Sequence, residues 1–237
     1  MNTADRIKGE LSAASDRNSV KEYQRFFKTG PGEYGEGDRF LGVTVPAQRT
    51  IARKYFRQAS LSDIGTLLDS GIHEHRLTAL VMLTMKYEKA GDDDGRMAAV
   101  DLYLEKIDRV NNWDLVDTSA PKILGPWLFD RDRTLLYDLV GSDILWRQRV
   151  AMMATFYFIK QKDFFETLKI AELLIDHPHD LIHKATGWML REIGNRDRET
   201  EENFLKTHYK RMPRTMLRYA IEKFSPGTRS RYLNGMV

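Results

Sequence analysis

Helical periodicity runs through most of this 237-residue chain and limits its fold more than any other feature. In residues 74–89, Leu77, Leu80 and Leu83 recur with other apolar residues at spacings of three and four, which places them on one face of a helix. Similar patterns cover residues 97–110, 115–128, 134–140, 146–159, 164–175, 181–193, 203–209 and 215–224. The strand-like run at residues 40–45 is short and contains Gly42. The chain is therefore predicted to be all-α.

The prolines mark the expected helix boundaries. Pro46, Pro178 and Pro213 each precede a helical pattern, which is typical of helix starts. Pro121 and Pro126 lie inside the pattern at 115–128, so we expect a break or kink there.

Composition excludes several classes of protein. With no cysteine, the chain has no disulfide, no Cys-ligated zinc and no thiol nucleophile. Apolar stretches are far shorter than the roughly 20 residues of a membrane span, and the first ten residues do not resemble a signal peptide. With 42% hydrophobic residues the chain is too apolar to be disordered, and it is long enough for one large domain or two small ones. We expect a single domain over 1–237 and a cytoplasmic monomer with no membrane partner.

The net charge of +3 is unevenly distributed. Residues 1–118 carry a net charge of −2, whereas residues 119–237 carry +5. Residues 204–237 alone hold eight basic residues and one acidic residue. This asymmetry favours a polyanionic partner, although a solvated basic tail explains the charge equally well.

A weak internal repeat refines the all-α prediction. Arg76, Arg149, Lys184 and Arg218 each enter a run of small and apolar residues, at successive spacings of 73, 35 and 34 residues. The first gap is two periods, and its midpoint falls on residues 113–117. A period in the mid-thirties is typical of an α-solenoid, whose helix pairs stack so that one set of helices lines a concave surface. The repeat predicts a basic track along that surface.

Three motifs suggest chemistry that their context does not support. Residues 30–35 spell G-x-G-x-x-G, but a helical pattern precedes them and acidic residues surround them, so we interpret 29–39 as a glycine-rich connecting loop. His73 and His75, like His177 and His179, lack the spacing of metal ligands, and we expect surface histidines near helix starts. No metal or cofactor is predicted.

The segment at residues 111–118 is a stronger candidate for chemistry. On a helix, Trp113 and Asp117 are spaced i, i+4 and so share one face, where an indole would lie beside a carboxylate. Spacing alone favours a different interpretation, in which Trp113 belongs to the core and Asp117 is an ordinary helix-face charge.

Four segments together resemble the AlkD-like DNA alkylation repair glycosylases, a family of HEAT-like repeat proteins. Each motif is weak alone, but their order and spacing are specific, and they span most of the chain. The segments are Phe40-Leu41-Gly42-Val43 with Pro46 and Arg49, Trp113-Asp114-Leu115-Val116-Asp117 with Pro121 and Leu124-Gly125, Trp146-Arg147-Gln148-Arg149, and Lys184 to Glu192.

The resemblance implies an active site formed by Trp113, Asp117 and Arg149. It implies that Trp188 lines a DNA-facing cleft. Combined with the basic track, it predicts DNA contacts by Lys184, Arg191, Arg76, Arg218 and Phe26. Two positions depart from the family pattern: Asn112 stands where some members have a second aromatic residue, and only Phe26 or Phe27 could replace the family's N-terminal tyrosine.

The implied function is hydrolysis of the N-glycosidic bond of cationic N3- or N7-alkylated purines in double-stranded DNA, without base flipping. Such a monofunctional DNA glycosylase would need no cofactor and would be associated with the nucleoid. The family also contains members without the catalytic residues, so the alternative is a non-catalytic HEAT-like module that binds DNA or protein.

Overall fold

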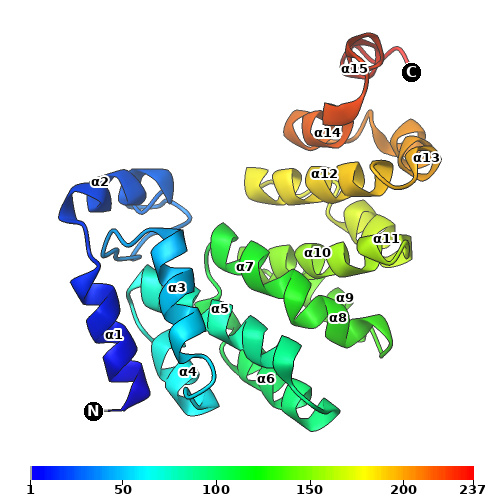
Figure 1. Ribbon diagram of the computed structural model, residues 1–237. Coiled ribbons are helices and arrows are strands. Elements are labelled where there is room, and N and C mark those ends of the chain that lie inside the picture. Colours follow the sequence, from blue (N-terminus) through cyan, green and yellow to red (C-terminus); the bar gives the residue numbers. More distant parts are fainter. Residues whose placement is uncertain (1) are drawn as a thin grey trace. The chain divides into compact units, whose positions relative to one another are not determined.

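The computed structural model describes residues 2–237, which form α-helices and short 3-10 helices connected by loops (Figure 1). Within this range no strand occurs, and the one β contact is an isolated bridge between Arg39 and Ile72. The all-α prediction is confirmed. The strand-like run at 40–45 has no regular secondary structure until α3 begins at Val45. None of the described helices is long and apolar enough to cross a membrane.

The chain divides into two compact units, Met1–Ile123 and Leu124–Val237. The sequence pattern does not reveal this boundary, and the single repeat domain over 1–237 stays a prediction. The two units are described separately below.

Unit 1 is built around the helix α5. It contains α1 (Thr3–Ala13), α2 (Arg17–Phe26), α3 (Val45–Tyr55), α4 (Leu61–Leu68), α5 (His73–Lys89), α6 (Asp93–Glu105) and α7 (Trp113–Ser119), with the 3-10 helices η1 (Ile107–Arg109) and η2 (Ala120–Lys122). Helix α5 packs against α1, α3, α4, α6 and α7. Its side chains Leu80, Met82 and Leu83 are fully buried, so α5 forms the centre of this core.

Unit 2 is organised around α10 and α12. It contains α8 (Leu124–Phe129), α9 (Thr134–Val140), α10 (Leu145–Lys160), α11 (Phe165–Leu173), α12 (Asp180–Gly194), α13 (Arg198–His208), α14 (Arg214–Ala220), η3 (Ile221–Lys223) and α15 (Pro226–Leu233). Helix α10 packs against α8, α9, α11 and α12, and α12 packs against α11, α13 and α14. Contact between helices that are near in sequence is the packing of an α-solenoid.

Two glycines allow helices of unit 2 to approach closely. A Cβ on Gly125 would lie 2.6 Å from the Ala154 carbonyl oxygen and 2.6 Å from Cβ of Tyr157, between α8 and α10. A Cβ on Gly187 would lie 2.3 Å from the Met216 carbonyl oxygen. Because no Cβ fits these contacts, the glycines are required by helix packing.

The repeat register is visible in unit 2. Arg149, Lys184 and Arg218 each occupy the fifth position of their helix, on α10, α12 and α14 respectively. The proline boundaries also hold: Pro46 lies in the first turn of α3, Pro213 caps α14, and Pro121 lies in η2, where the helical pattern breaks. Pro126 lies in the first turn of α8, where a missing N–H costs no helical hydrogen bond.

Candidate active site

Helix α7 presents Trp113 and Asp117 to one pocket. The helix begins at Trp113 because Asn112 is in an extended conformation and its side-chain oxygen accepts the Trp113 backbone N–H at 2.9 Å. Both Trp113 and Asp117 are partly exposed, and both line the pocket. Asn112, the departure from the family pattern, therefore has a structural role as the cap of this helix.

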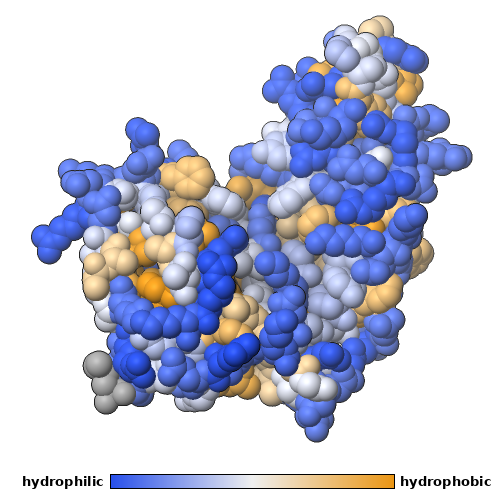
Figure 2. All heavy atoms as spheres, in the orientation of Figure 1, coloured by the Kyte–Doolittle hydropathy of each residue, from blue (hydrophilic) through white to orange (hydrophobic). Residues whose placement is uncertain are grey.

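The pocket has a volume of about 550 Å³ and is lined by residues of unit 1 alone. Apolar and aromatic side chains form much of its wall: Tyr23, Phe26, Phe27, Phe40, Val45, Leu77 and Trp113. Charged side chains also face it: Glu22, Arg49, His73, Glu74, Asp114, Asp117 and Lys122. Figure 2 shows apolar atoms at the surface of this unit near α2 and α3, among hydrophilic neighbours. Aromatic faces beside carboxylates suit a flat, positively charged ligand.

The aromatic side chains support Trp113 from two sides. The Phe27 ring is stacked on the indole, with centroids 5.5 Å apart and an interplanar angle of 18°. The Phe26 ring meets the indole edge-on at 5.7 Å. Phe26 is itself 61% exposed, an unusual position for phenylalanine, so its ring is available to a ligand at the pocket.

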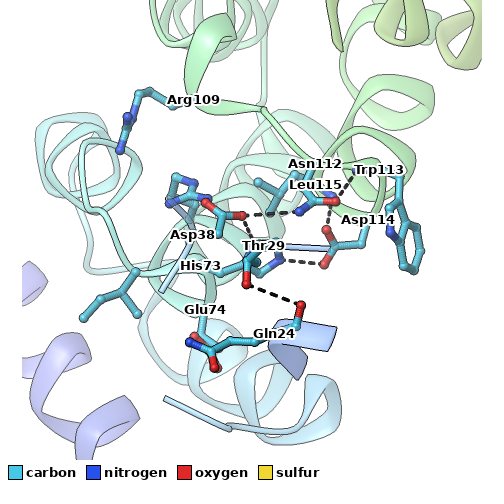
Figure 3. Close-up of polar contacts among 12 residues, drawn as sticks. Gln24, Thr29, Asp38, His73, Glu74, Arg109, Asn112, Trp113, Asp114 and Leu115 are labelled. Atoms are coloured by element: carbon cyan, nitrogen blue, oxygen red, sulfur yellow. Dashed lines mark hydrogen bonds and ion pairs between the residues drawn. The ribbon is translucent and has the colours of Figure 1, made fainter. Parts of the chain in front are cut away.

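A largely buried network of charged groups forms part of the pocket wall and extends behind it (Figure 3). Nδ1 of His73 lies 3.0 Å from a carboxylate oxygen of Asp38, and Nε2 lies 2.8 Å from a carboxylate oxygen of Asp114. The Arg76 guanidinium donates to the other Asp38 oxygen at 2.5 Å, and the Asn112 side-chain amide donates to Asp38 at 3.3 Å. The network joins the loop, α5 and α7.

The charges of this network explain the pKa shifts of its members. Burial by itself would lower the pKa of His73, but the charge of Asp114 and the hydrogen bonds to Asp114 and Asp38 raise it to about 9. Burial opposes ionisation of Asp38, yet the His73 hydrogen bond and the Arg76 charge outweigh it and lower the pKa of Asp38. His73 is therefore an imidazolium at neutral pH.

The prediction of surface histidines is wrong for His73 and His75, which are 2% and 4% exposed. The acidic partners of His73 lie 35 and 41 residues away in sequence. His75 bonds instead to the Ser70 hydroxyl at 2.8 Å, and burial lowers its pKa to about 4, so it is neutral.

Arg76, which the sequence analysis expects to contact DNA, is buried in the structure. Its side chain is 1% exposed and is bound to Asp38 and to the Ser70 carbonyl oxygen, so it supplies no surface charge.

The segment that follows the glycine-rich loop, residues 40–44, is held against α5. The Glu74 carboxylate accepts backbone N–H groups of Leu41, Gly42 and Val43 at 2.8–3.3 Å. Gly42 has a φ of +81°, and a Cβ there would lie 2.1 Å from the Asp16 carbonyl oxygen. These contacts place Phe40 in the pocket wall and Asp38 in the network, two roles with no local signal in the sequence.

The remaining predicted residues lie in unit 2. Arg149 is 4% exposed, and its guanidinium donates to the Leu181 carbonyl oxygen at 2.5 Å. Lys184, Trp188 and Arg191 are partly exposed and share one face of α12. Arg218 is exposed on α14. The basic track is therefore interrupted, since two of its four cations, Arg76 and Arg149, are buried.

The α12 side chains have partners of their own. Lys184 pairs with Asp180 at 2.7 Å, Arg191 pairs with Glu222, and the Trp188 indole N–H donates to Glu192 at 3.2 Å. In residues 2–237 no cluster of three or more His, Cys, Asp or Glu side chains has the arrangement of a metal site.

Comparisons with known proteins support the broader part of the resemblance seen in the sequence, the DNA alkylation repair family. The family model described as "DNA alkylation repair enzyme" matches residues 7–224. A solved structure described as a predicted DNA alkylation repair enzyme from Enterococcus faecalis is similar in fold, with a TM-score of 0.71 and 15% identity over 90% of this chain and 97% of that chain. The comparison with curated proteins gives no match. Because the family model covers nearly the whole chain, this protein belongs to the DNA alkylation repair enzyme family.

Proposed function

We propose that this protein is a DNA glycosylase that hydrolyses the N-glycosidic bond of cationic N3- and N7-alkylated purines in duplex DNA. The observation that supports this most strongly is the pocket of unit 1, where the Asp117 carboxylate and the Trp113 indole lie beside the exposed ring of Phe26. A cationic base or sugar is the ligand that such a combination stabilises.

The chemistry follows from the state of the leaving group. An N3- or N7-alkylated purine already carries a positive charge, so it departs as a neutral base and needs no proton donor. Glycosidases with poorer leaving groups use two carboxylates, one of them as a general acid. Here a single carboxylate suffices.

Asp117 is proposed to stabilise the transition state. As the glycosidic bond breaks, positive charge develops on the deoxyribose, and the Asp117 carboxylate would stabilise this oxocarbenium ion and orient the attacking water. At a separation of about 4 Å and an effective dielectric of ~20, the attraction is about 4 kcal/mol, equivalent to roughly 10³ in rate. The rate rises only by the part of this attraction that is gained in the transition state.

Trp113 and Phe26 are proposed to hold the nucleotide. The indole face would pack against the sugar and the cationic base, an interaction worth about 0.5–2 kcal/mol. Phe26 takes the place of the family's N-terminal tyrosine. Because both rings are accessible at the surface of unit 1, we propose that the base is excised without being flipped out of the helix.

The basic residues of unit 2 are proposed to bind the DNA backbone. Lys184, Arg191 and Arg218 would contact phosphates, with Trp188 between them, and would fix the register without reading sequence. Arg149 would hold the phosphate next to the lesion. Since Arg149 is nearly buried, this contact requires a phosphate to approach α10 closely.

Substitution of the carboxylate tests the proposal. Purified protein should release 7-methylguanine or 3-methyladenine from methylated duplex DNA, and Asp117→Asn should bind the duplex normally but lose most of the release. Asp101→Asn is a matched control, because Asp101 is an exposed carboxylate of unit 1 on α6 and does not line the pocket.

A non-catalytic DNA-binding module would behave differently in the same assay. It would bind duplex DNA in a salt-sensitive manner, release no base, and show no special sensitivity at Asp117. A protein-binding scaffold would show neither release nor an effect of Arg149→Glu on DNA affinity. Either result overturns the proposed enzyme.

A further inference from the structure

The position of α7 depends on contacts that Trp113 and Asp117 do not make themselves. Asp114 follows Trp113 directly and precedes Asp117 by almost one helical turn. Its carboxylate accepts the Leu115 backbone N–H at 2.9 Å through one oxygen and faces His73 Nε2 at 2.8 Å through the other. One carboxylate therefore joins the first turn of α7 to α5.

His73 is bound from both sides. Its Nδ1 faces a carboxylate oxygen of Asp38 and its Nε2 faces one of Asp114, at 3.0 Å and 2.8 Å. An ionised carboxylate only accepts hydrogen bonds, so both ring nitrogens must carry protons to satisfy these contacts. With both carboxylates ionised this geometry requires an imidazolium, which together with the Arg76 guanidinium offsets the charges of Asp38 and Asp114.

The His73 ring also reaches Trp113 through aromatic contacts. It lies 4.8 Å from the centroids of both Phe27 and Phe40, and Phe27 is stacked on the Trp113 indole. A cation against aromatic faces adds attraction to this packing. His73 thus supports the Trp113 indole by two routes, through Asp114 in α7 and through Phe27.

We propose that His73, held between Asp38 and Asp114, is a positioning residue that sets the orientation of Trp113 and Asp117 at the pocket. This role rests on the proposed glycosylase function where it concerns catalysis, and it adds residues that hold in place the two that would meet the nucleotide. His73 itself would touch no reacting atom.

The experiment compares Asp114→Asn and His73→Gln with His75→Gln. Asp114→Asn keeps the shape of the side chain but removes one charge, so it tests the link to α7 even if His73→Gln fails to fold. His75 is the matched control, because it is a buried histidine on the same helix whose ring bonds to Ser70 and does not line the pocket. Circular dichroism and urea unfolding establish that each variant is folded.

The first readout does not depend on catalysis. In nitrogen-15 spectra at pH 7, the His73 ring should have both nitrogens protonated, whereas the His75 ring should be neutral. The indole N–H resonance of Trp113 should shift in Asp114→Asn and His73→Gln and stay unchanged in His75→Gln. A neutral His73 ring would overturn the proposal. So would a Trp113 resonance that is unchanged in both Asp114→Asn and His73→Gln.

The second readout is the single-turnover rate of base release. Because a misplacement of about 1 Å can cost about 10²-fold in rate, Asp114→Asn should lower this rate by about 10²-fold with duplex Kd unchanged, and His75→Gln should leave both unchanged. Wild-type rates of base release in both Asp114→Asn and His73→Gln would contradict the positioning role. If wild-type protein releases no base while the Trp113 shifts are observed, the proposed function fails and the positioning of Trp113 by His73 stands.

Discussion

Replacement of Glu201 by glutamine should make unit 2 more stable at alkaline pH. Glu201 lies on α13 and is 1% exposed. Its Oε1 has no hydrogen-bond partner among residues 2–237, and its Oε2 lies 3.8 Å from a guanidinium nitrogen of Arg198. Burial raises the pKa of this carboxyl from 4.5 to about 8. Between these two values the folded protein keeps a proton that the unfolded chain has released, so the free energy of unfolding falls as pH rises through this interval.

The magnitude follows from the width of that interval. At about 1.4 kcal/mol per pH unit, the span from 4.5 to about 8 corresponds to at most about 5 kcal/mol. Glutamine keeps the size of the side chain and cannot ionise, so Glu201→Gln should lose this pH dependence and should exceed wild type in stability at pH 8.5.

Urea unfolding at pH 5.5, 7 and 8.5 measures the effect, with tryptophan fluorescence as the probe because Trp127, Trp146 and Trp188 all lie in unit 2. Glu199→Gln is the control, since Glu199 is exposed on the same helix. The reasoning is refuted if wild type and Glu201→Gln lose stability in parallel as the pH rises.

Two further substitutions test the pocket wall and the helix packing. Phe26→Ala should reduce the rate of base release by a factor that corresponds to about 0.5–1.5 kcal/mol, because the Phe26 ring lies beside Trp113. The substitution should not lower stability, because this ring is exposed. Phe26→Tyr keeps the ring and should retain the rate. Gly187→Ala should lower the free energy of unfolding by about 1–3 kcal/mol, because its Cβ would lie 2.3 Å from the Met216 carbonyl oxygen. Gly9→Ala on α1, where a Cβ would meet no atom within 4 Å, should not destabilise, and equal unfolding midpoints for the two alanine variants would contradict the packing argument.

The helical framework was largely predictable because its signals are local. Apolar periodicity marked α5, α10 and α12, and Pro121 marked the break after α7. The short helices α4 and α15 lie outside the predicted helical ranges, although Ile64, Leu67 and Leu68 of α4 do recur at helical spacing. Serine capping begins each of them, at Ser60 and Ser225, and tertiary packing supports the rest.

The candidate site was predictable only where its residues share a helix. The i, i+4 spacing of Trp113 and Asp117 implied a common face, and both residues line the pocket. The role of His73 was not accessible in this way, because a histidine is buried and charged only when distant carboxylates fold against it. The burial of Arg76 was not predictable for the same reason: its partner Asp38 comes from the loop, and the sequence shows only a cation entering a helix.

Release of alkylated base by the wild-type protein is the most direct test of the account. Duplex DNA treated with a methylating agent is incubated with excess protein, and free 7-methylguanine and 3-methyladenine are quantified under single-turnover conditions. The account predicts release by wild type, with a rate reduced by up to roughly 10³ in Asp117→Asn and unchanged in Asp101→Asn. A wild-type protein that binds the duplex and releases neither base would contradict it.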